Sequence, residues 1–343
     1  MKQTLIIKAE QVTQPDILKA IQTIIIGGGL VVFPTETVYG IGANALDKEA
    51  SKKIYDVKGR PSDNPLIVHI GQIEELHLYA REVPNYAKSL IQAFWPGPLT
   101  LILKKQDIVP YTTTAGLDTV AIRLPKHETA LALIQGVKLP LAAPSANLSG
   151  KPSATEFKHV FEDLNGKVDC IIDGGPSSIG IESTVLDCTK EIPTILRPGA
   201  VTQSMIERIL QRPILDASTL QVEDAPKSPG MKYTHYKPKG DVTILYGPIE
   251  KVQEYVSSQV DSSIPTAVIC ASDYELLFPK VRVRTLGYLS QPEWIAKQLF
   301  SALREMDEWG MQRIFIHSFP EVEIGHAVMN RLLKAAGYQT ITL

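Results

Sequence analysis

A long segment, residues 211–240, divides this chain into two parts. It shows no clear helical or strand period. Its prolines and glycines are Pro213, Pro226, Pro229, Gly230, Pro238 and Gly240. Loops of this length are uncommon inside a compact domain and usually serve as linkers or functional loops. Because two domains are also the usual expectation for 343 residues, we place one domain at residues 1–210 and a second at residues 241–343.

The first domain mixes helical patterns with short apolar runs. Apolar residues recur at helical spacing over Pro15–Ile26, and Gly27–Gly29 end this helix. These glycines precede the run Leu30–Phe33, whereas a phosphate-binding glycine loop follows a strand. Further strands are predicted at Leu66–Ile70, Leu99–Leu103, Val120–Leu124, Leu139–Ala143, Cys170–Asp173, Ser183–Asp187 and Thr194–Leu196. Because strands and helices do not alternate strictly, we expect a twisted, mixed open α/β sheet.

The second domain shows a more regular alternation. Strands are predicted at Val242–Tyr246, Thr266–Cys270 and Arg313–Ser318, and helices at Glu293–Glu308 and Ile324–Ala336. This order favours βαβ units with a parallel, Rossmann-like sheet. No Gly-x-Gly-x-x-Gly motif follows the first strand, so a dinucleotide site is not supported there.

Composition and charge exclude several classes of protein. The formal net charge of −2 gives no overall basic field of the kind that marks a nucleic-acid coat protein. Cys170, Cys188 and Cys270 lie far apart without a Cys-x-x-Cys pair, which argues against a structural zinc site and a disulfide framework. The apolar part of the N-terminus is too short for a signal peptide, and no apolar run reaches membrane-spanning length. We therefore expect a cytoplasmic protein.

The segment Lys58–Leu66 combines two cations with a rigid backbone. Lys58 and Arg60 stand two residues apart, and Pro61 and Pro65 fix φ at their own positions. Rigidly held cations suit a multiply charged anion, and phosphate is the commonest such ligand. The segment therefore predicts a nucleotide site.

Strand alternation places two further polar residues on one face. In Thr119–Leu124, the apolar residues share one face, so Thr119 and Arg123 share the other, about 13 Å apart. They either contact two ends of one bound molecule or lie on a solvated face. His69, within another apolar strand, is either a buried core histidine or a ligand contact.

Several loops carry polar side chains with two possible roles. Ser145 and Asn147 follow a buried strand, where ligands often bind in α/β proteins, although ordinary turn chemistry explains them equally well. Thr35, Ser183 and Arg197 leave the same alternatives open.

The segment 230–237 differs in composition from a flexible spacer. It holds two tyrosines, two lysines and a histidine, among them Lys232 and Tyr236, whereas flexible linkers are rich in Gly and Ser. We favour a lid that closes over a charged ligand over a passive strap.

Taken together and in this order, these segments resemble the threonylcarbamoyl-adenylate synthase family in its two-domain form, whose first domain is YrdC-like. The resemblance covers nearly the whole chain. It rests on Phe33–Gly42, Lys58–His69, Trp95–Thr100, Ala115–Arg123, Ala143–Asn147, Glu182–Thr184, Arg197–Gly199 and Pro229–Tyr236.

The resemblance implies a reaction and a fold. The reaction joins ATP, L-threonine and bicarbonate or CO₂ into threonylcarbamoyl-AMP and pyrophosphate. A tRNA threonylcarbamoyl transferase then uses the product to make threonylcarbamoyladenosine at position 37 of tRNA, with room for a weak direct contact between enzyme and tRNA. The first domain is expected to surround a large basic cavity, and residues 211–240 to act as its lid.

The resemblance also implies residue roles. Lys58 and Arg60 are expected to stabilise phosphoryl charge in catalysis. The expected ATP contacts are Lys58, Ser62, Thr119, Ser145, Asn147, Arg197 and Tyr236, with Lys232 beside Tyr236. The expected L-threonine contacts are Thr35, His69, Arg123 and Ser183. No protein-bound metal is expected, because Mg²⁺ usually rides on ATP phosphates and waters.

Two other functions are compatible with parts of the pattern. A non-catalytic RNA-binding module would explain Lys58 and Arg60 as phosphate contacts, but it predicts stacking aromatics, and only 7% of residues are aromatic. A carbamoyl transferase of hydrogenase maturation shares a related fold, but it carries cysteine-paired zinc modules that this sequence lacks.

Overall fold

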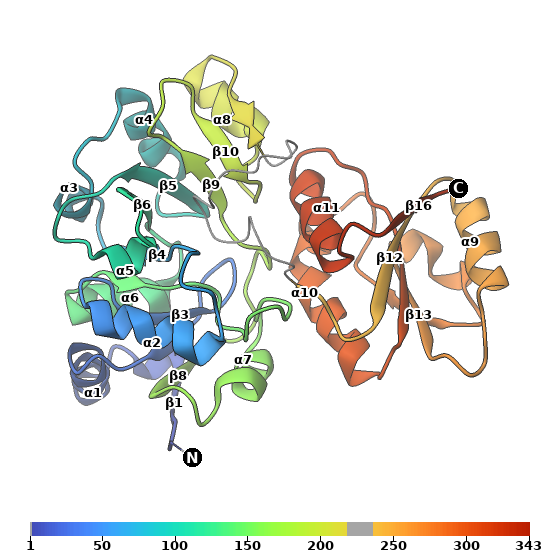
Figure 1. Ribbon diagram of the computed structural model, residues 1–343, viewed down its shortest axis with the longest axis horizontal. Coiled ribbons are helices and arrows are strands. Elements are labelled where there is room, and N and C mark those ends of the chain that lie inside the picture. The colour runs from blue at the N-terminus through green and yellow to red at the C-terminus, as the bar shows by residue number, and fades with distance from the viewer. Residues whose placement is uncertain (1, 218–235) are drawn as a thin grey trace. The chain divides into compact units, whose positions relative to one another are not determined.

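The computed structural model describes residues 2–217 and 236–343, which divide into two compact units (Figure 1). Unit 1 comprises Met1–Ser149, Ala154–Ser178 and Glu182–Lys232, and unit 2 comprises Gly150–Ser153, Ile179–Ile181 and Tyr233–Leu343. Two short segments from the first 210 residues are thus grouped with unit 2. Our domain boundaries at residues 210 and 241 stay a prediction.

Unit 1 is built on an eleven-stranded sheet with the strand order β1-β8-β2-β3-β7-β4-β6-β5-β9-β10-β11. The sheet is mixed, since β4 pairs with β6 in parallel and β5 pairs with β6 antiparallel. The prediction of a mixed α/β sheet is therefore confirmed. The strands are β1 Leu5–Lys8, β2 Val31–Phe33, β3 Gly40–Asn44, β4 Ile67–His69, β5 Leu99–Lys104, β6 Thr119–Arg123, β7 Leu141–Ala142, β8 Cys170–Asp173, β9 Thr184–Asp187, β10 Thr194–Arg197 and β11 Leu215–Asp216.

The helices of unit 1 follow local sequence signals. Pro15 occupies the first turn of α1, and the chain leaves that helix at Gly27, as predicted. Gly59 ends α2 in the left-handed conformation, with φ of 61°. Lys58 is thus the last residue of α2, and the non-helical part of the Lys58–Leu66 segment begins at Gly59. The helices are α1 Pro15–Ile26, α2 Lys48–Lys58, α3 Leu76–Tyr79, α4 Asn85–Phe94, α5 Tyr111–Thr114, α6 Glu128–Val137, α7 Phe157–Leu164 and α8 Gln203–Leu210.

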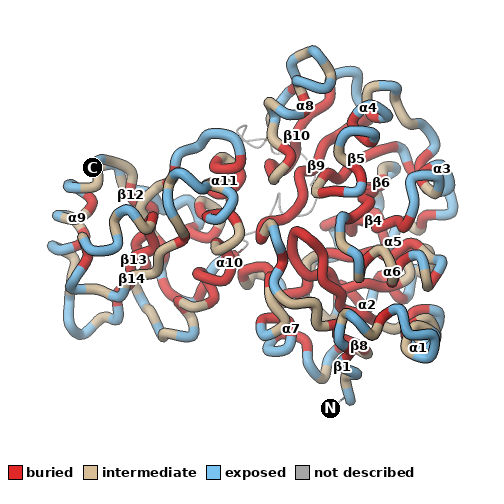
Figure 2. Tube along the Cα trace, turned by 180° about the vertical axis from the view of Figure 1, so that it is seen from behind, coloured by how far each residue is buried: buried red, intermediate tan, exposed pale blue. Residues whose placement is uncertain are grey.

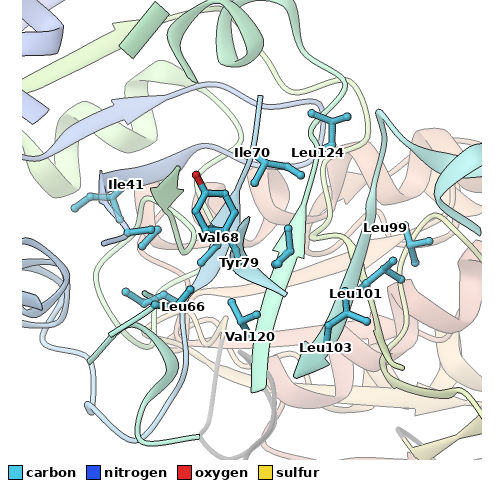
Figure 3. Close-up of a cluster of buried hydrophobic side chains, with 14 of the residues drawn as sticks. Ile41, Leu66, Val68, Ile70, Tyr79, Leu99, Leu101, Leu103, Val120 and Leu124 are labelled. Atoms are coloured by element: carbon cyan, nitrogen blue, oxygen red, sulfur yellow. The ribbon is translucent and has the colours of Figure 1, made fainter. Parts of the chain in front are cut away.

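Alternation along the central strands separates the core from a second face of the sheet. Figure 3 shows the core side chains of β4, β5 and β6 gathered on one side, and Figure 2 shows these strands as buried. The core residues of these strands and the residues that follow them include Val68, Ile70, Leu99, Leu101, Leu103, Val120, Ile122 and Leu124. The intervening residues form a separate small cluster of Ile67, Ile102, Ala121, Val185 and Leu196. The second face of the sheet therefore carries a small apolar cluster of its own.

Unit 2 is an α/β unit with a five-stranded sheet. Its strand order is β14-β13-β15-β12-β16, and every recorded pairing is parallel. The predicted βαβ units and parallel sheet are confirmed. The strands are β12 Asp241–Tyr246, β13 Thr266–Cys270, β14 Arg282–Thr285, β15 Arg313–His317 and β16 Thr340–Thr342, and the helices are α9 Ile249–Ser258, α10 Pro292–Glu308 and α11 Ile324–Ala335.

Two global features bear on the class of protein. All three cysteines are buried and free. Within residues 2–217 and 236–343, no helix combines the length and the apolar character that crossing a bilayer requires.

Candidate active site

Arg123 is the centre of the polar part of the second face. It is the last residue of β6 and is 3% exposed. Its Nε donates to the Gly97 carbonyl at 3.2 Å, and its Nη1 donates to Thr37 Oγ1 at 2.9 Å. Its Nη2 lies 2.7 Å from Oε1 of Glu36, which is also buried. The guanidinium is therefore held in one orientation by two segments, the loop after β2 and the loop that contains Gly97.

The loop after β2 continues this network through two threonine hydroxyls. Thr35 Oγ1 donates to the Val38 carbonyl at 2.6 Å, which uses its hydroxyl proton. The 2.9 Å contact between Thr35 Oγ1 and Thr37 Oγ1 must then have Thr37 as donor. The polarised chain runs from Arg123 through Thr37 and Thr35 to Val38, so it orders the loop around the cation.

His69 lies beside Arg123 in the sheet. The two residues are partners in the parallel register of β4 and β6. Burial, together with the Arg123 charge, lowers the pKa of His69 to about 3, so the ring is neutral. Its Nδ1 is 3.2 Å from the Ile67 carbonyl, and its ring meets Phe33 edge to face at 6.1 Å. His69 is thus both a wall residue and a neutral polar group beside a cation.

Lys58 organises a second group of predicted residues. Its side chain is 3% exposed, and its Nζ donates to the main-chain carbonyls of Ser145 and Asn147. Ser145 Oγ donates to Asn147 Oδ1 at 2.6 Å. The last helical residue of α2 thus ties the loop after β7 around a buried ammonium group.

The rest of the Lys58–Leu66 segment contains a second cation and a buried amide. Arg60 turns back on its own loop, with Nη2 3.2 Å from the carbonyls of both Asn64 and Pro65. Ser62 is exposed. Asn64, which sequence reasoning missed, is 1% exposed, and neither its side-chain oxygen nor its nitrogen has a hydrogen-bond partner among the described residues. A buried amide of this kind needs a partner, and a ligand can supply it.

Ser183 and Arg197 form a third group with Thr100. Arg197 donates through Nε and Nη2 to the Ser183 carbonyl at 3.1 and 3.0 Å. Ser183 Oγ also lies 2.8 Å from Thr100 Oγ1. This group adjoins the Arg123 group, because Gly97 accepts from Arg123 and the next carbonyl, that of Pro98, accepts the Thr184 N–H at 3.0 Å.

Most of the predicted site residues thus fall into three groups of neighbouring side chains, and the others lie apart from these groups. Thr35, His69 and Arg123 lie together, as do Lys58, Ser145 and Asn147, and as do Ser183 and Arg197. Thr119, half-buried, stands at the opposite end of β6 from Arg123. Tyr236 is buried within unit 2, where its ring packs against Phe300 at 4.9 Å. Lys232 and the rest of the segment 218–235 lie outside the described residues.

Gly199 allows the third group to form. A Cβ at this position would lie 2.4 Å from the Thr184 nitrogen and 2.8 Å from the Glu182 carbonyl oxygen. We therefore expect Gly199→Ala to displace Ser183 and Arg197, to cost about 1–3 kcal/mol of stability, and to lower turnover at least about tenfold. Gly27→Ala is the control, since its Cβ meets nothing closer than 3.2 Å. Turnover of Gly199→Ala equal to that of this control would contradict the expectation.

The described residues contain no group of three or more His, Cys, Asp or Glu side chains that could hold a metal ion. Lys58, Arg123 and Arg197 are all buried, and each donates to main-chain carbonyls. Such an arrangement suits the binding and positioning of anionic groups.

Comparison with known proteins assigns the chain to a family. A family model described as "Telomere recombination" matches residues 23–199, and one described as "Threonylcarbamoyl-AMP synthase, C-terminal domain" matches residues 201–337. The threonylcarbamoyl-AMP synthase of Pyrococcus abyssi is 48% identical over 320 residues, which are 92% of this chain and 92% of the relative. That of Bacillus subtilis is 48% identical over 313 residues, 91% and 90% of the two chains.

A solved structure agrees along the whole length. The crystal structure of P. abyssi Sua5 complexed with L-threonine superposes with a TM-score of 0.90 at 44% identity, covering 100% of this chain and 99% of that one. Both domains and their order are therefore shared with these relatives. The chain belongs to the threonylcarbamoyl-AMP synthase family of nucleotidyltransferases, in its two-domain Sua5 form.

Proposed function

We propose that this chain makes threonylcarbamoyl-AMP and pyrophosphate from ATP, L-threonine and bicarbonate or CO₂, with the three polar groups described above as its active site. The product would pass to a transferase that modifies adenosine 37 of tRNA. The observation that carries the site assignment is the set of three buried cations, Lys58, Arg123 and Arg197, at the ends of α2, β6 and β10 in unit 1.

The reaction depends more on the positioning of its substrates than on covalent bonds between enzyme and substrate. The threonine amine, once neutral, bonds to the carbon of CO₂ and loses a proton, or bonds to the carbon of bicarbonate with loss of water, and either route gives a carbamate. A carbamate oxygen then bonds to the α-phosphorus of ATP while the bond from that phosphorus to the pyrophosphate oxygen breaks. Preorganised cations stabilise the charge on the transferred group and the leaving group.

We assign the ATP side to the loops held by Lys58. Ser145 and Asn147 would contact the nucleotide, and Lys58 and Arg60 would face the phosphates, with Ser62, Thr119, Arg197 and Tyr236 completing the set. Support comes from the Lys58 bonds to the 145–147 loop and from the unpartnered amide of Asn64 in the same segment as Arg60. Mg²⁺ would arrive on the ATP phosphates.

We assign the threonine side to Arg123 and its neighbours. Nη1 and Nη2 of Arg123 carry two N–H bonds each, and each nitrogen has at most one partner among the described residues. The remaining pair suits a carboxylate. Thr35, His69 and Ser183 would surround the rest of the amino acid, with His69 contributing a neutral ring.

Further parts of the proposal concern the larger architecture. The second face of the unit 1 sheet would line the large basic cavity of YrdC-like domains, and unit 2 would be Rossmann-like. Residues 211–240 would act as the lid, with Lys232 and Tyr236 closing over the phosphates. We place the enzyme in the cytoplasm.

The proposal is tested by pyrophosphate release from ATP, with threonine and bicarbonate omitted in turn. Release that needs both, together with threonylcarbamoyl-AMP identified by mass spectrometry, is the expected result. A folded preparation that binds tRNA in a salt-dependent way but releases no pyrophosphate would instead support the RNA-binding module.

Asn64→Leu separates a binding role from a structural one. Replacing an unpartnered buried amide by an apolar group of similar size removes a desolvation cost. We therefore expect the thermal stability of the ligand-free variant to equal or exceed that of the wild type, while its KM for ATP rises at least about tenfold. Asn85→Leu, at the exposed start of α4, is the control. A less stable Asn64→Leu protein with unchanged KM for ATP would contradict the assignment.

A further inference from the structure

Arg123 already has an anionic partner, and this partner belongs to the protein. The Glu36 carboxylate is 5% exposed and follows β2 in the loop that also supplies Thr35 and Thr37. Its Oε1 lies 2.7 Å from Arg123 Nη2 and accepts the Lys126 N–H at 3.0 Å. Burial by itself would raise the pKa of the Glu36 carboxyl, but Arg123 and the Lys126 N–H hold it below its usual range. Glu36 is therefore an anion within the site.

The second oxygen of this carboxylate lacks a hydrogen-bond donor. Glu36 Oε2 is buried and has no hydrogen-bond partner among the described residues. A buried carboxylate oxygen without a donor is costly, and such atoms call for a partner of opposite charge or an N–H or O–H group. Oε1 already accepts the Lys126 N–H and lies in ion-pair contact with Arg123 Nη2, so Oε2 is the carboxylate oxygen that lacks a partner.

The protein supplies no second cation to this carboxylate within the described residues. His69 is neutral, as argued above, and burial lowers the pKa of His127 as well. The Lys126 residue that donates its N–H is exposed. Arg123 and Glu36 together therefore have a net charge near zero before any substrate binds. A bound carboxylate alone would leave this buried site with an excess negative charge, whereas a zwitterion would not.

We propose that Glu36 binds the ammonium group of L-threonine through Oε2 while Arg123 binds its carboxylate. The Arg123–Glu36 pair would then bind the zwitterionic amino acid more tightly than an acid that lacks the amine. This inference rests on the proposed function, because it uses Arg123 as the carboxylate site. The α-ammonium and carboxylate groups of an amino acid are adjacent, as are Arg123 Nη2 and Glu36 Oε1. The assignment concerns the zwitterion that arrives from solution, and attack on the carbon donor follows loss of the ammonium proton.

The competing role for Glu36 is structural. Both Glu36 Oε2 and Nδ1 of His127 lack partners among the described residues, and the charge of Glu36 acts on His127. A water between these atoms would let Glu36 join two loops without any contact to substrate. In that structural role Glu36 would not distinguish ligands with an amine from ligands without one, whereas a residue that binds the amine would.

The test compares L-threonine with (R)-3-hydroxybutanoate, which keeps the carboxylate and the hydroxyl in the same configuration but lacks the amine. Binding to the full chain is measured by calorimetry for the wild type, Glu36→Gln and Glu36→Asp. The control is Glu128→Gln, which removes a carboxylate from the exposed start of α6. We expect Glu36→Gln to weaken threonine at least about tenfold while leaving the hydroxy acid unchanged or bound more tightly. Glu36→Asp should restore part of the preference, and the control should keep it.

The outcomes separate this inference from the proposed function. If Glu36→Gln weakened the binding of both ligands equally, the ratio of their dissociation constants would stay at its wild-type value. That result would show that Glu36 does not bind the amine. In steady state, the KM for threonine should rise in Glu36→Gln with kcat changed less than about threefold. If the wild type itself neither bound threonine nor released pyrophosphate, the proposed function would fail instead.

Discussion

Lys58→Ala is expected to lower the rate of pyrophosphate release by about a thousandfold or more. The substitution removes a buried positive charge and both hydrogen bonds that tie the carbonyls of Ser145 and Asn147 to the end of α2. The loop would then lose the geometry that positions the nucleotide, in addition to the charge that faces it. Steady-state release at saturating ATP and threonine measures the effect.

A matched variant separates this loss from unfolding. Lys52→Ala removes the same type of charge from an exposed position on α2 and should leave turnover unchanged. Lys58→Ala should lose about 2 kcal/mol of stability through its two lost bonds to a charged donor, which thermal unfolding can follow. A folded Lys58→Ala protein with turnover close to that of Lys52→Ala would remove Lys58 from the active site.

Arg123→Ala is expected to abolish threonine-dependent turnover and to destabilise unit 1 by about 3–5 kcal/mol. The large cost arises because the change leaves Glu36 as a buried carboxylate without its cation. The Thr37 hydroxyl and the Gly97 carbonyl also lose their donor. Denaturant unfolding and threonine titration measure the two effects separately.

The stability loss in Arg123→Ala should depend on pH in a defined direction. In the wild type, burial opposes ionisation, but Arg123 holds the pKa of the Glu36 carboxyl below its unfolded value. The pair therefore stabilises the protein above the unfolded pKa, and this stability is lost as pH falls through the lower folded pKa. Without Arg123, burial raises the folded pKa, so the variant loses stability as pH rises through that value.

A double variant tests the cause. Arg123→Met combined with Glu36→Gln removes both charges, so it should recover most of the stability that Arg123→Ala loses, without recovering turnover. Melting temperatures measured between acidic and neutral pH should converge for the wild type and Arg123→Ala at the acidic end. A constant difference across the range would show that Glu36 is not the source of the loss.

Local signals in the sequence were sufficient for most of the elements. The helix Pro15–Ile26 and the strand Cys170–Asp173 have the predicted bounds, since periodicity, a first-turn proline and a β-branched run all act within a few residues. β3 was missed because its sequence, Gly40–Asn44, contains two glycines and depends on pairing with β2 and β7. β14 was missed because its edge position tolerates Arg282 and Arg284, which interrupt the apolar pattern.

The candidate site was predictable in part. Motif order and strand alternation selected Lys58, His69 and Arg123 as candidates, but their burial and hydrogen-bond partners depend on long-range contacts that spacing does not contain. Glu36 had a signal of its own, since it is the single charged residue in Phe33–Gly42 and lies three residues after the end of β2. No sequence signal distinguished Asn64, because an asparagine between prolines is typical of a turn, and only its burial sets it apart.

The position of β8 in the sheet has a consequence for synthesis on the ribosome. β8 lies between β1 and β2, with Leu5 paired to Cys170 and Val31 paired to the same residue. The first strand to emerge must therefore wait for most of unit 1 to be translated before it gains a neighbour. Nascent chains that end before Cys170 expose the apolar edge of Leu5–Lys8 and Val31–Phe33, and are the species that chaperones would have to shield.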